Sequence, residues 1–275
     1  MKHFGRSFHF QLAACAMVAF LGGCGGGSGG SGGPLPAPGS TSTPVSSSPP
    51  TPTTSPSASP SPTPTPAPPG PSSQTIHTSP GAVIGLANQF QPNIGDTPTG
   101  GQGQPVDGIT CDPTSSNNYH VHFYVGLWVN GNQVAIPAGL GMQNPAAPQN
   151  GFINTASCFY HIHTHDASGL IHVEDPNPAN IPITQSLFTV KNLFDEWGIT
   201  VNANQFGPYT GPVRVFTSGQ IYRGGATGQI TPASDLTFFG TDPNAVPIYS
   251  YEIVDIEVGP TFPSSLPNVY FYEVH

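Results

Sequence analysis

Residues 119–129, YHVHFYVGLWV, have the pattern of one long β-strand. The odd positions are all apolar, whereas the even positions begin with His120 and His122. Because successive side chains of a strand point to opposite faces, this alternation predicts one face packed on a core and an opposite face that carries two imidazoles. Asn130-Gly131 follows, a dipeptide typical of two-residue hairpin turns, and residues 133–136 are expected to return as the partner strand.

A second hairpin is expected in residues 159–174, FYHIHTHDASGLIHVE, because the central DASG has the composition of a turn. A loop of two or of four residues at this point gives the same register. That register sets His163 opposite His172 and His161 opposite Glu174. Directly opposed residues have Cβ atoms about 4.5–5.5 Å apart, which is close enough to bind one metal ion. A loop of three or five residues would shift the register by one and separate these side chains.

We therefore expect a transition-metal site on this strand face, since imidazole nitrogen and carboxylate oxygen suit copper or zinc, with iron as a further candidate. The expected ligands are His120, His122, His161, His163, His172 and Glu174. His165 is left out of this set because it adjoins the turn and can face solvent. Coordination needs neutral imidazole, so metal affinity is expected to fall as the pH drops through about 6.5.

Two other interpretations of the same residues stay open at this point. Glu174 or Asp166 could orient a ligating imidazole instead of binding the ion. Alternatively, the histidines only line a polar sheet face or form a hydrogen-bonded cluster.

The rest of the domain carries short strand-like segments and one helical segment. Phe188–Ile199 has apolar residues at helical spacing and is expected to end at Gly198. The strand-like segments are residues 212–217, 220–222, 236–239, 248–258 and 269–274. Many short strands between Gly, Pro, Asn and Asp clusters predict an all-β fold, an antiparallel sandwich or barrel, with one short helix.

The N-terminus has the features of a targeting signal. Lys2 and Arg6 precede an apolar run at residues 12–21, which is shorter than the roughly 20 apolar residues of a membrane-spanning helix. The run ends in LGGC, which resembles the lipobox of bacterial lipoproteins. The resemblance implies a signal peptide over residues 1–23 and lipidation of Cys24, so that acyl chains anchor the protein.

Residues 24–75 are rich in Gly, Ser, Pro and Thr and contain almost nothing that could pack in a core. They are expected to form a disordered tether between the lipid anchor and a His-rich β domain at residues 76–275. The protein is thus expected to be exported and anchored to the cell envelope, with its domain in the periplasm or at the cell surface.

Charge and cysteine content narrow the range of partners. Residues 76–275 hold all 14 acidic residues but only three of the five basic ones, a formal charge of −11 with histidine neutral. Such a domain excludes nucleic acid and anionic lipid as electrostatic partners and favours cations. Membrane contact is expected through the lipid anchor only, and no sequence feature identifies a protein partner. Cys111 and Cys158 are expected to form a disulfide, because an exported domain meets an oxidising environment.

Two stretches carry a resemblance: YHVHFYVGLWVNGNQVAIPAGLGM at residues 119–142 and CFYHIHTHDASGLIHVEDP at residues 158–176. They resemble a little-characterised family of exported bacterial and archaeal proteins, over about residues 105–200. The resemblance implies export and a shared histidine-rich site, without an activity. Three functions are compatible with the sequence: metal binding or delivery, a metal-dependent redox or hydrolytic enzyme, and a binding or adhesion module without metal.

Overall fold

The computed structural model describes residues 64–90, 93–115, 118–176, 185–220 and 228–272. The expected signal peptide, Cys24 and most of the expected tether lie outside these residues. The described strands form open sheets and no closed barrel, with one α-helix, so the predicted all-β class is confirmed. No helix among the described residues is long and apolar enough to cross a membrane.

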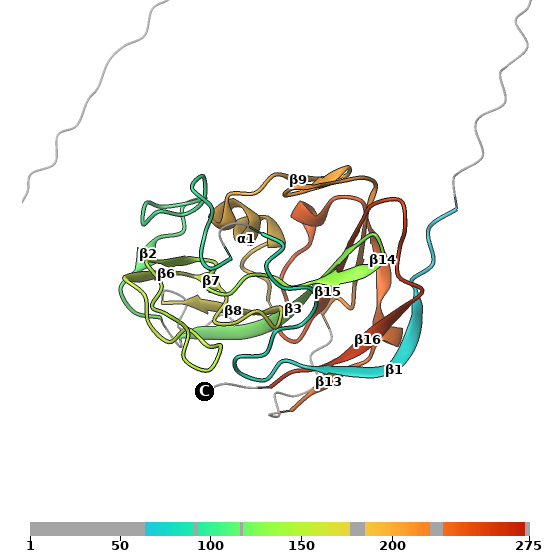
Figure 1. Ribbon diagram of the computed structural model, residues 1–275, viewed down its shortest axis with the longest axis horizontal. Coiled ribbons are helices and arrows are strands. Elements are labelled where there is room, and N and C mark those ends of the chain that lie inside the picture. The colour runs from blue at the N-terminus through green and yellow to red at the C-terminus, as the bar shows by residue number, and fades with distance from the viewer. Residues whose placement is uncertain (1–63, 91–92, 116–117, 177–184, 221–227, 273–275) are drawn as a thin grey trace, which may run out of the picture. The chain divides into compact units, whose positions relative to one another are not determined.

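The largest sheet has seven strands in the order β14-β12-β15-β3-β8-β7, with β4 beside β3 (Figure 1). Neighbouring strands are antiparallel except β15 and β3, which are parallel. The strands are β3 (Tyr119–Val129), β4 (Asn132–Val134), β7 (Ile162–His163), β8 (Leu170–Asp175), β12 (Val213–Thr217), β14 (Thr237–Gly240) and β15 (Ile253–Val258). The predicted strand 119–129 therefore lies in the middle of the molecule and has partners on both sides.

Both predicted hairpins form in the expected register. Trp128 pairs with Gln133 across the turn at Asn130-Gly131, whose positive φ angles of 51° and 80° suit a tight hairpin. In the second hairpin, His163 pairs with His172, as the turn composition predicts. β8 also pairs with β3, so β3, β8 and β7 lie in that order in one sheet.

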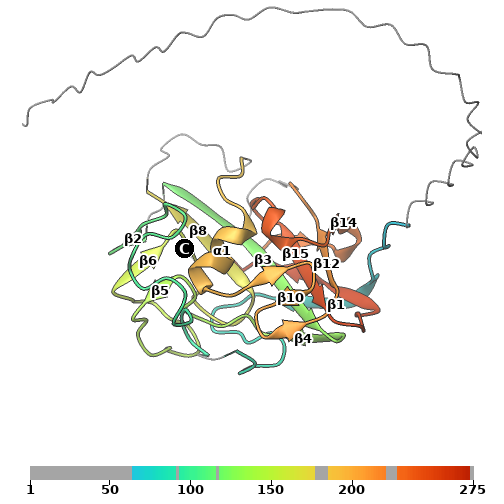
Figure 2. The same cartoon turned by 90° about the horizontal axis from the view of Figure 1, so that it is seen from above.

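The two faces of this sheet pack against different cores. The odd positions of β3 join a large apolar core with α1 (Val190–Trp197), which Figure 2 shows in front of β3 and β8. Val190, Leu193, Phe194 and Trp197 supply the buried side of the helix, and Gly198 ends it with a φ of 76°. The helix predicted from the apolar spacing is confirmed.

The opposite face packs against a second sheet, in the order β1-β16-β13. This sheet consists of β1 (Gly70–His77), β16 (Ser265–Tyr270) and β13 (Ile230–Thr231). Its Leu266 and Val269 lie in the same apolar cluster as Tyr124 and Phe216 of the large sheet. The two sheets thus form a sandwich at this end. β1 pairs with β16 in parallel and begins within the stretch predicted as tether, because backbone pairing needs no apolar sequence.

Two smaller sheets complete the described fold. One consists of β9 (Val201–Asn202), β10 (Gln205–Phe206) and β11 (Tyr209–Thr210). The other has the order β2-β6-β5, from β2 (Cys111–Asp112), β6 (Cys158–Tyr160) and β5 (Met142–Gln143). A disulfide joins Cys111 of β2 to Cys158 of β6, with Cα atoms 5.4 Å apart, as predicted. It holds the strand that leads directly into β7.

Candidate metal centre

Three neighbouring strands bring histidines to one face of the large sheet. In β7, β8 and β3, cross-strand pairing aligns His163 with His172 and His172 with His122. One pair further along, Glu174 of β8 lies opposite His120 of β3. The face is the one expected for His120 and His122, because the alternation within β3 sends its odd residues to the core. We call the group His120, His122, His163, His165, His172 and Glu174 the histidine cluster.

Ligand atoms converge closely at the β3 side of the histidine cluster. Nε2 of His122 lies 3.1 Å from Nε2 of His120 and 3.1 Å from Nδ1 of His172. Oε1 of Glu174 lies 3.3 Å from Nε2 of His120 and 3.5 Å from Nδ1 of His172. Its second oxygen, Oε2, is buried without a hydrogen-bond partner. A buried carboxyl oxygen without a partner is costly, and a bound cation would satisfy it.

At the β7 side, His163 and His165 face each other through Nε2 atoms 3.2 Å apart. Nδ1 of His163 lies 2.9 Å from the backbone oxygen of Tyr160, and Nδ1 of His165 lies 2.6 Å from that of Ile153. A carbonyl oxygen only accepts, so each Nδ1 carries the proton and donates it. Such a backbone anchor on the far ring nitrogen is typical of metal-ligating histidines.

His165 is therefore part of the histidine cluster, although the sequence analysis left it out because it adjoins the turn. Its ring stacks on Phe152, with ring centroids 4.7 Å apart and planes within 4°. The preceding residue, Thr164, is held by a hydrogen bond: its hydroxyl donates to the backbone oxygen of Pro137 at 2.9 Å. These contacts fix the two residues that follow β7 and orient the side chain of His165 toward His163. The signal for it in the sequence was the continued His-x-His spacing.

His161 is not part of the histidine cluster and contacts two aspartates instead. Its Nε2 is 3.1 Å from Oδ2 of Asp112 and its Nδ1 is 3.4 Å from Oδ2 of Asp175. The reason is a bend in the chain: β6 ends at Tyr160 in one sheet and β7 begins at Ile162 in another. The alternation of side chains is interrupted at that change, although the backbone oxygen of His161 still accepts from the N–H of Glu174.

Within the described residues, two overlapping sets have ligand atoms within 4.8 Å of one another. The β7 set is His163, His165, His172 and Glu174. The β3 set is His120, His122 and His172. The described residues thus contain buried histidine and glutamate clusters that could bind a metal ion.

Burial makes the imidazoles of the cluster poor proton acceptors. Burial first and the neighbouring His165 second lower the pKa of His163 to about 4, although Glu174 and the hydrogen bond with Tyr160 raise it. The pKa values of His122 and His172 lie well below the usual range for the same reasons, burial first and neighbouring histidines second. Burial also lowers the pKa of His165. These four rings are therefore neutral near pH 7, which is the form that coordinates metal.

Two groups that the sequence analysis did not select support the β7 side. Gly141 has a φ of +68°, and a Cβ atom there would lie 2.2 Å from the oxygen of Ile162 and 3.0 Å from Cβ of His163. Its N–H donates to Oδ1 of Asp96 at 2.9 Å. Burial raises the pKa of Asp96 to about 8, so this carboxyl is mostly protonated at neutral pH. Only glycine fits this close approach to His163.

Asp166 holds the turn and is not a member of either ligand set. Its Oδ1 accepts from the N–H and the hydroxyl of Ser168, at 3.0 and 2.6 Å. Its Oδ2 accepts from the N–H of Gly81 at 2.8 Å. The interpretation of Asp166 as a group that orients a ligand therefore finds no hydrogen bond to a histidine here, because one oxygen is bonded within the turn and the other to Gly81.

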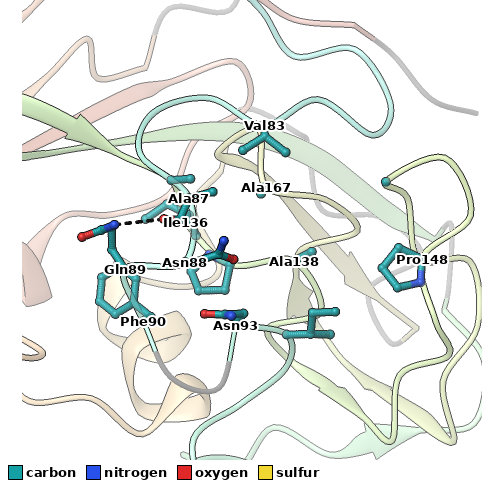
Figure 3. A pocket seen from close by; sticks show the side chains of 14 residues that line it. Val83, Ala87, Asn88, Gln89, Phe90, Asn93, Ile136, Ala138, Pro148 and Ala167 are labelled. Carbon is teal, nitrogen blue, oxygen red and sulfur yellow. Dashed lines mark hydrogen bonds between the residues drawn. The ribbon is translucent and has the colours of Figure 1, made fainter.

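A pocket of about 350 Å³ lies beside the same turn but is lined by other residues (Figure 3). Its lining includes Val83, Phe90, Ile136 and Ala167, together with the amides of Asn88 and Asn93. No residue of the histidine cluster is among those that line it. A molecule bound in this pocket would therefore meet apolar side chains and amides instead of the imidazoles.

Comparison with protein-family models, curated proteins and solved structures gives no match to this chain. The function of the chain therefore has to be inferred from its own sequence and from the geometry of the histidine cluster.

Proposed function

We propose that this protein binds a transition-metal ion in the β7 set, as a lipid-tethered metal-binding or metal-delivery protein of the cell envelope. The observation that carries the proposal is the contact between His163 and His165. A neutral imidazole has one N–H, and in both rings that N–H is donated to a carbonyl through Nδ1. Two unprotonated nitrogens then face each other at 3.2 Å. Their lone pairs repel unless a cation lies between them, and the low pKa of both rings disfavours a proton in that role.

The donor atoms suit zinc or copper, with iron as a further candidate. Four ligands at 2.0–2.1 Å from a tetrahedral ion lie about 3.3 Å from one another. The separations in the β7 set are 3.2 Å between His163 and His165, 3.5 Å between His172 and Glu174, and 3.9 Å between His163 and Glu174. Only small side-chain shifts are needed to reach that geometry. Three nitrogens and one carboxylate oxygen are borderline ligands, which favour these metals over calcium or magnesium.

Binding or delivery is favoured over catalysis by the surroundings of the site. His163 is fully buried, and His172 and Glu174 are nearly so. A catalytic metal needs a ligand position open to substrate, usually beside a pocket. The described pocket next to the turn is lined by other residues. The N-terminal signal and the formal charge of −11 over residues 76–275 support a cation-binding domain tethered outside the cytoplasm.

Metal analysis of the full chain tests this function. Protein purified without chelators is expected to carry copper or zinc, and the metal-free protein should bind Zn²⁺ and Cu²⁺ in competition with a chromophoric chelator. A His163→Asn/His165→Asn double variant should bind at least a hundredfold more weakly. His161→Asn is the matched control, since this buried histidine lies outside both sets, and it should bind as the parent does. Absence of metal and of affinity in the parent would support a binding or adhesion module without metal.

The cellular location needs a separate test. A Cys24→Ser variant should be released from membranes on fractionation and should not incorporate labelled lipid. Unchanged membrane retention and labelling would contradict the lipid anchor without affecting the proposal on the metal.

A further inference from the structure

We infer that the centre takes two metal ions, the second one in the β3 set, with His172 and Glu174 between the two. This inference rests on the proposed function, because it assumes that the β7 set holds the first ion. It adds a second site of the same chemical class, a transition-metal dication bound by imidazole, and a stoichiometry of two per chain.

The first observation is the position of Nε2 of His122. A ring nitrogen has a single in-plane direction, occupied by a proton or by a lone pair, and therefore makes one good hydrogen bond. Nε2 of His122 nevertheless has two nitrogen neighbours, in His120 and His172, both at 3.1 Å. One hydrogen bond can satisfy only one of these contacts. An ion at the point where the three nitrogens converge would bind all three. The two nitrogen–nitrogen distances of 3.1 Å are close to the ligand–ligand distance of about 3.3 Å in a tetrahedral site.

The second observation is that the two sets have His172 in common. The ring of His172 lies between them, with its centroid 4.3 Å from that of His122 and 4.5 Å from that of His165. An imidazole has two nitrogens and can bind one ion through each: Nδ1 of His172, which lies 3.1 Å from Nε2 of His122, would bind the ion of the β3 set, and Nε2 of the same ring would bind the ion of the β7 set. In that case two nitrogen–metal bonds form, the remaining N–H bond of His172 breaks, and its proton leaves to solvent.

The third observation is the carboxylate of Glu174. Oε1 lies 3.3 Å from Nε2 of His120, in the β3 set, and 3.9 Å from Nε2 of His163, in the β7 set. Oε2 is buried and has no hydrogen-bond partner. A carboxylate can bind one ion through each oxygen, so a second ion would satisfy the free oxygen and add negative charge between two cations. With a single ion bound through Oε1 alone, Oε2 would remain buried and unpaired.

The two positions differ in access. The side chain of His120 is 21% exposed, whereas that of His163 is fully buried. The ion of the β3 set should therefore exchange with solvent faster than the ion of the β7 set. A chelator should remove the two ions in two kinetic phases of equal amplitude.

The test is the stoichiometry of the full chain with Zn²⁺ as the probe, measured by elemental analysis and by competitive titration. The parent should bind two ions. A His120→Asn/His122→Asn variant should bind one and lose the fast phase of removal by chelator. A His77→Asn variant, changed at an exposed histidine of β1, should still bind two. Loading with Cu²⁺ adds a spectroscopic readout, since two ions bridged by His172 should show weaker paramagnetic resonance than two isolated ions.

The outcomes separate the two proposals. One zinc ion per parent chain at saturation, unchanged in the His120→Asn/His122→Asn variant, overturns the second site and leaves the proposed function intact. No bound ion in the parent overturns both. Folding of each variant is checked by circular dichroism, and if the double variant is unfolded, the single His120→Asn change at the partly exposed position replaces it with the same expected loss of one ion.

Discussion

The titration of His163 should be visible in the stability of the metal-free protein. Burial lowers the pKa of this ring from 6.5 to about 4. Below pH 6.5 the unfolded chain therefore binds a proton at this residue, and the folded chain does so only below about 4. Between these values the unfolded state binds more protons, so the free energy of unfolding falls as the pH falls.

The size of the effect follows from the same two values. While the unfolded chain is protonated at His163 and the folded chain is not, each pH unit lowers the free energy of unfolding by about 1.4 kcal/mol. Between pH 7 and pH 5 the contribution of His163 therefore amounts to about 2 kcal/mol, and it reaches about 3 kcal/mol at pH 4. His163 is fully buried, so solvent screening removes little of it.

The assay compares the parent with His163→Asn by urea unfolding in the presence of chelator, at pH 7 and pH 5. Asparagine does not titrate, and its amide can still donate to the oxygen of Tyr160. The advantage of the parent over the variant should shrink by about 2 kcal/mol at the lower pH. All other titrating groups remain in both proteins and largely cancel. An equal pH dependence of the two proteins would show that His163 titrates normally and would refute the reasoning.

The same lowered pKa values correct the pH dependence expected from unperturbed histidine. At pH 5.5 an imidazole with a pKa of 6.5 is about 90% protonated, whereas one with a pKa of about 4 is almost entirely neutral. Metal binding at the β7 set should therefore persist well below pH 6.5.

Three other changes have defined outcomes. Cys111→Ala/Cys158→Ala opens a loop of 47 residues and should lower the free energy of unfolding by about 4 kcal/mol, measured by denaturant titration, and a loss below 1 kcal/mol would show that the chain-entropy argument does not apply. Gly141→Ala should weaken zinc binding because its Cβ would clash with Ile162 and His163 of β7. Gly108→Ala is the control, since this residue also has a positive φ, +82°, but no atom lies within 4 Å of its added Cβ, so the change should cost backbone strain alone. Equal zinc affinity of the two variants would contradict this packing. Asp96→Asn removes a carboxyl whose pKa is about 8 in the folded protein, so between pH 4 and pH 8 the folded parent binds more protons than the unfolded parent and loses stability as the pH rises. The free energy of unfolding of the variant should therefore increase relative to that of the parent over this interval. A difference that does not change with pH would be inconsistent with a buried neutral Asp96.

Local patterns predicted the centre of the fold well. The alternation in β3, the turn at Asn130-Gly131 and the helix ended by Gly198 all depend on nearby residues, and each is present in the structure. The parallel pairing of β15 with β3 and of β1 with β16 could not be predicted in this way. Those pairs join strands far apart in the chain, and parallel pairing requires a long connection that no local motif specifies.

The site shows the same division between local and distant causes. Cross-strand pairing of His163 with His172 follows from the length of one turn, and it was predictable. The positions of the His161 and His165 side chains depend instead on whether residues 158–165 form one continuous strand in a single sheet. β6 is held to β2 by the Cys111–Cys158 bond and by the pairing of Cys111 with Tyr160, so the chain must bend at His161 to reach β8.

That bend explains why His161, an expected ligand, lies outside the histidine cluster and why His165 lies within it. Alternation assigns His161, His163 and His165 to a single face only if all three residues belong to one regular strand. β7 contains only Ile162 and His163, so the rule ends on both sides of it. Before β7, the neighbouring carboxylates of Asp112 and Asp175 hold His161. After β7, Phe152 and the oxygen of Ile153 hold His165 against His163. The composition of the histidine cluster is therefore decided by Asp175 at the end of β8 and by two segments outside the hairpin, at Asp112 and at residues 152–153. A two-residue strand is short enough for those contacts to prevail.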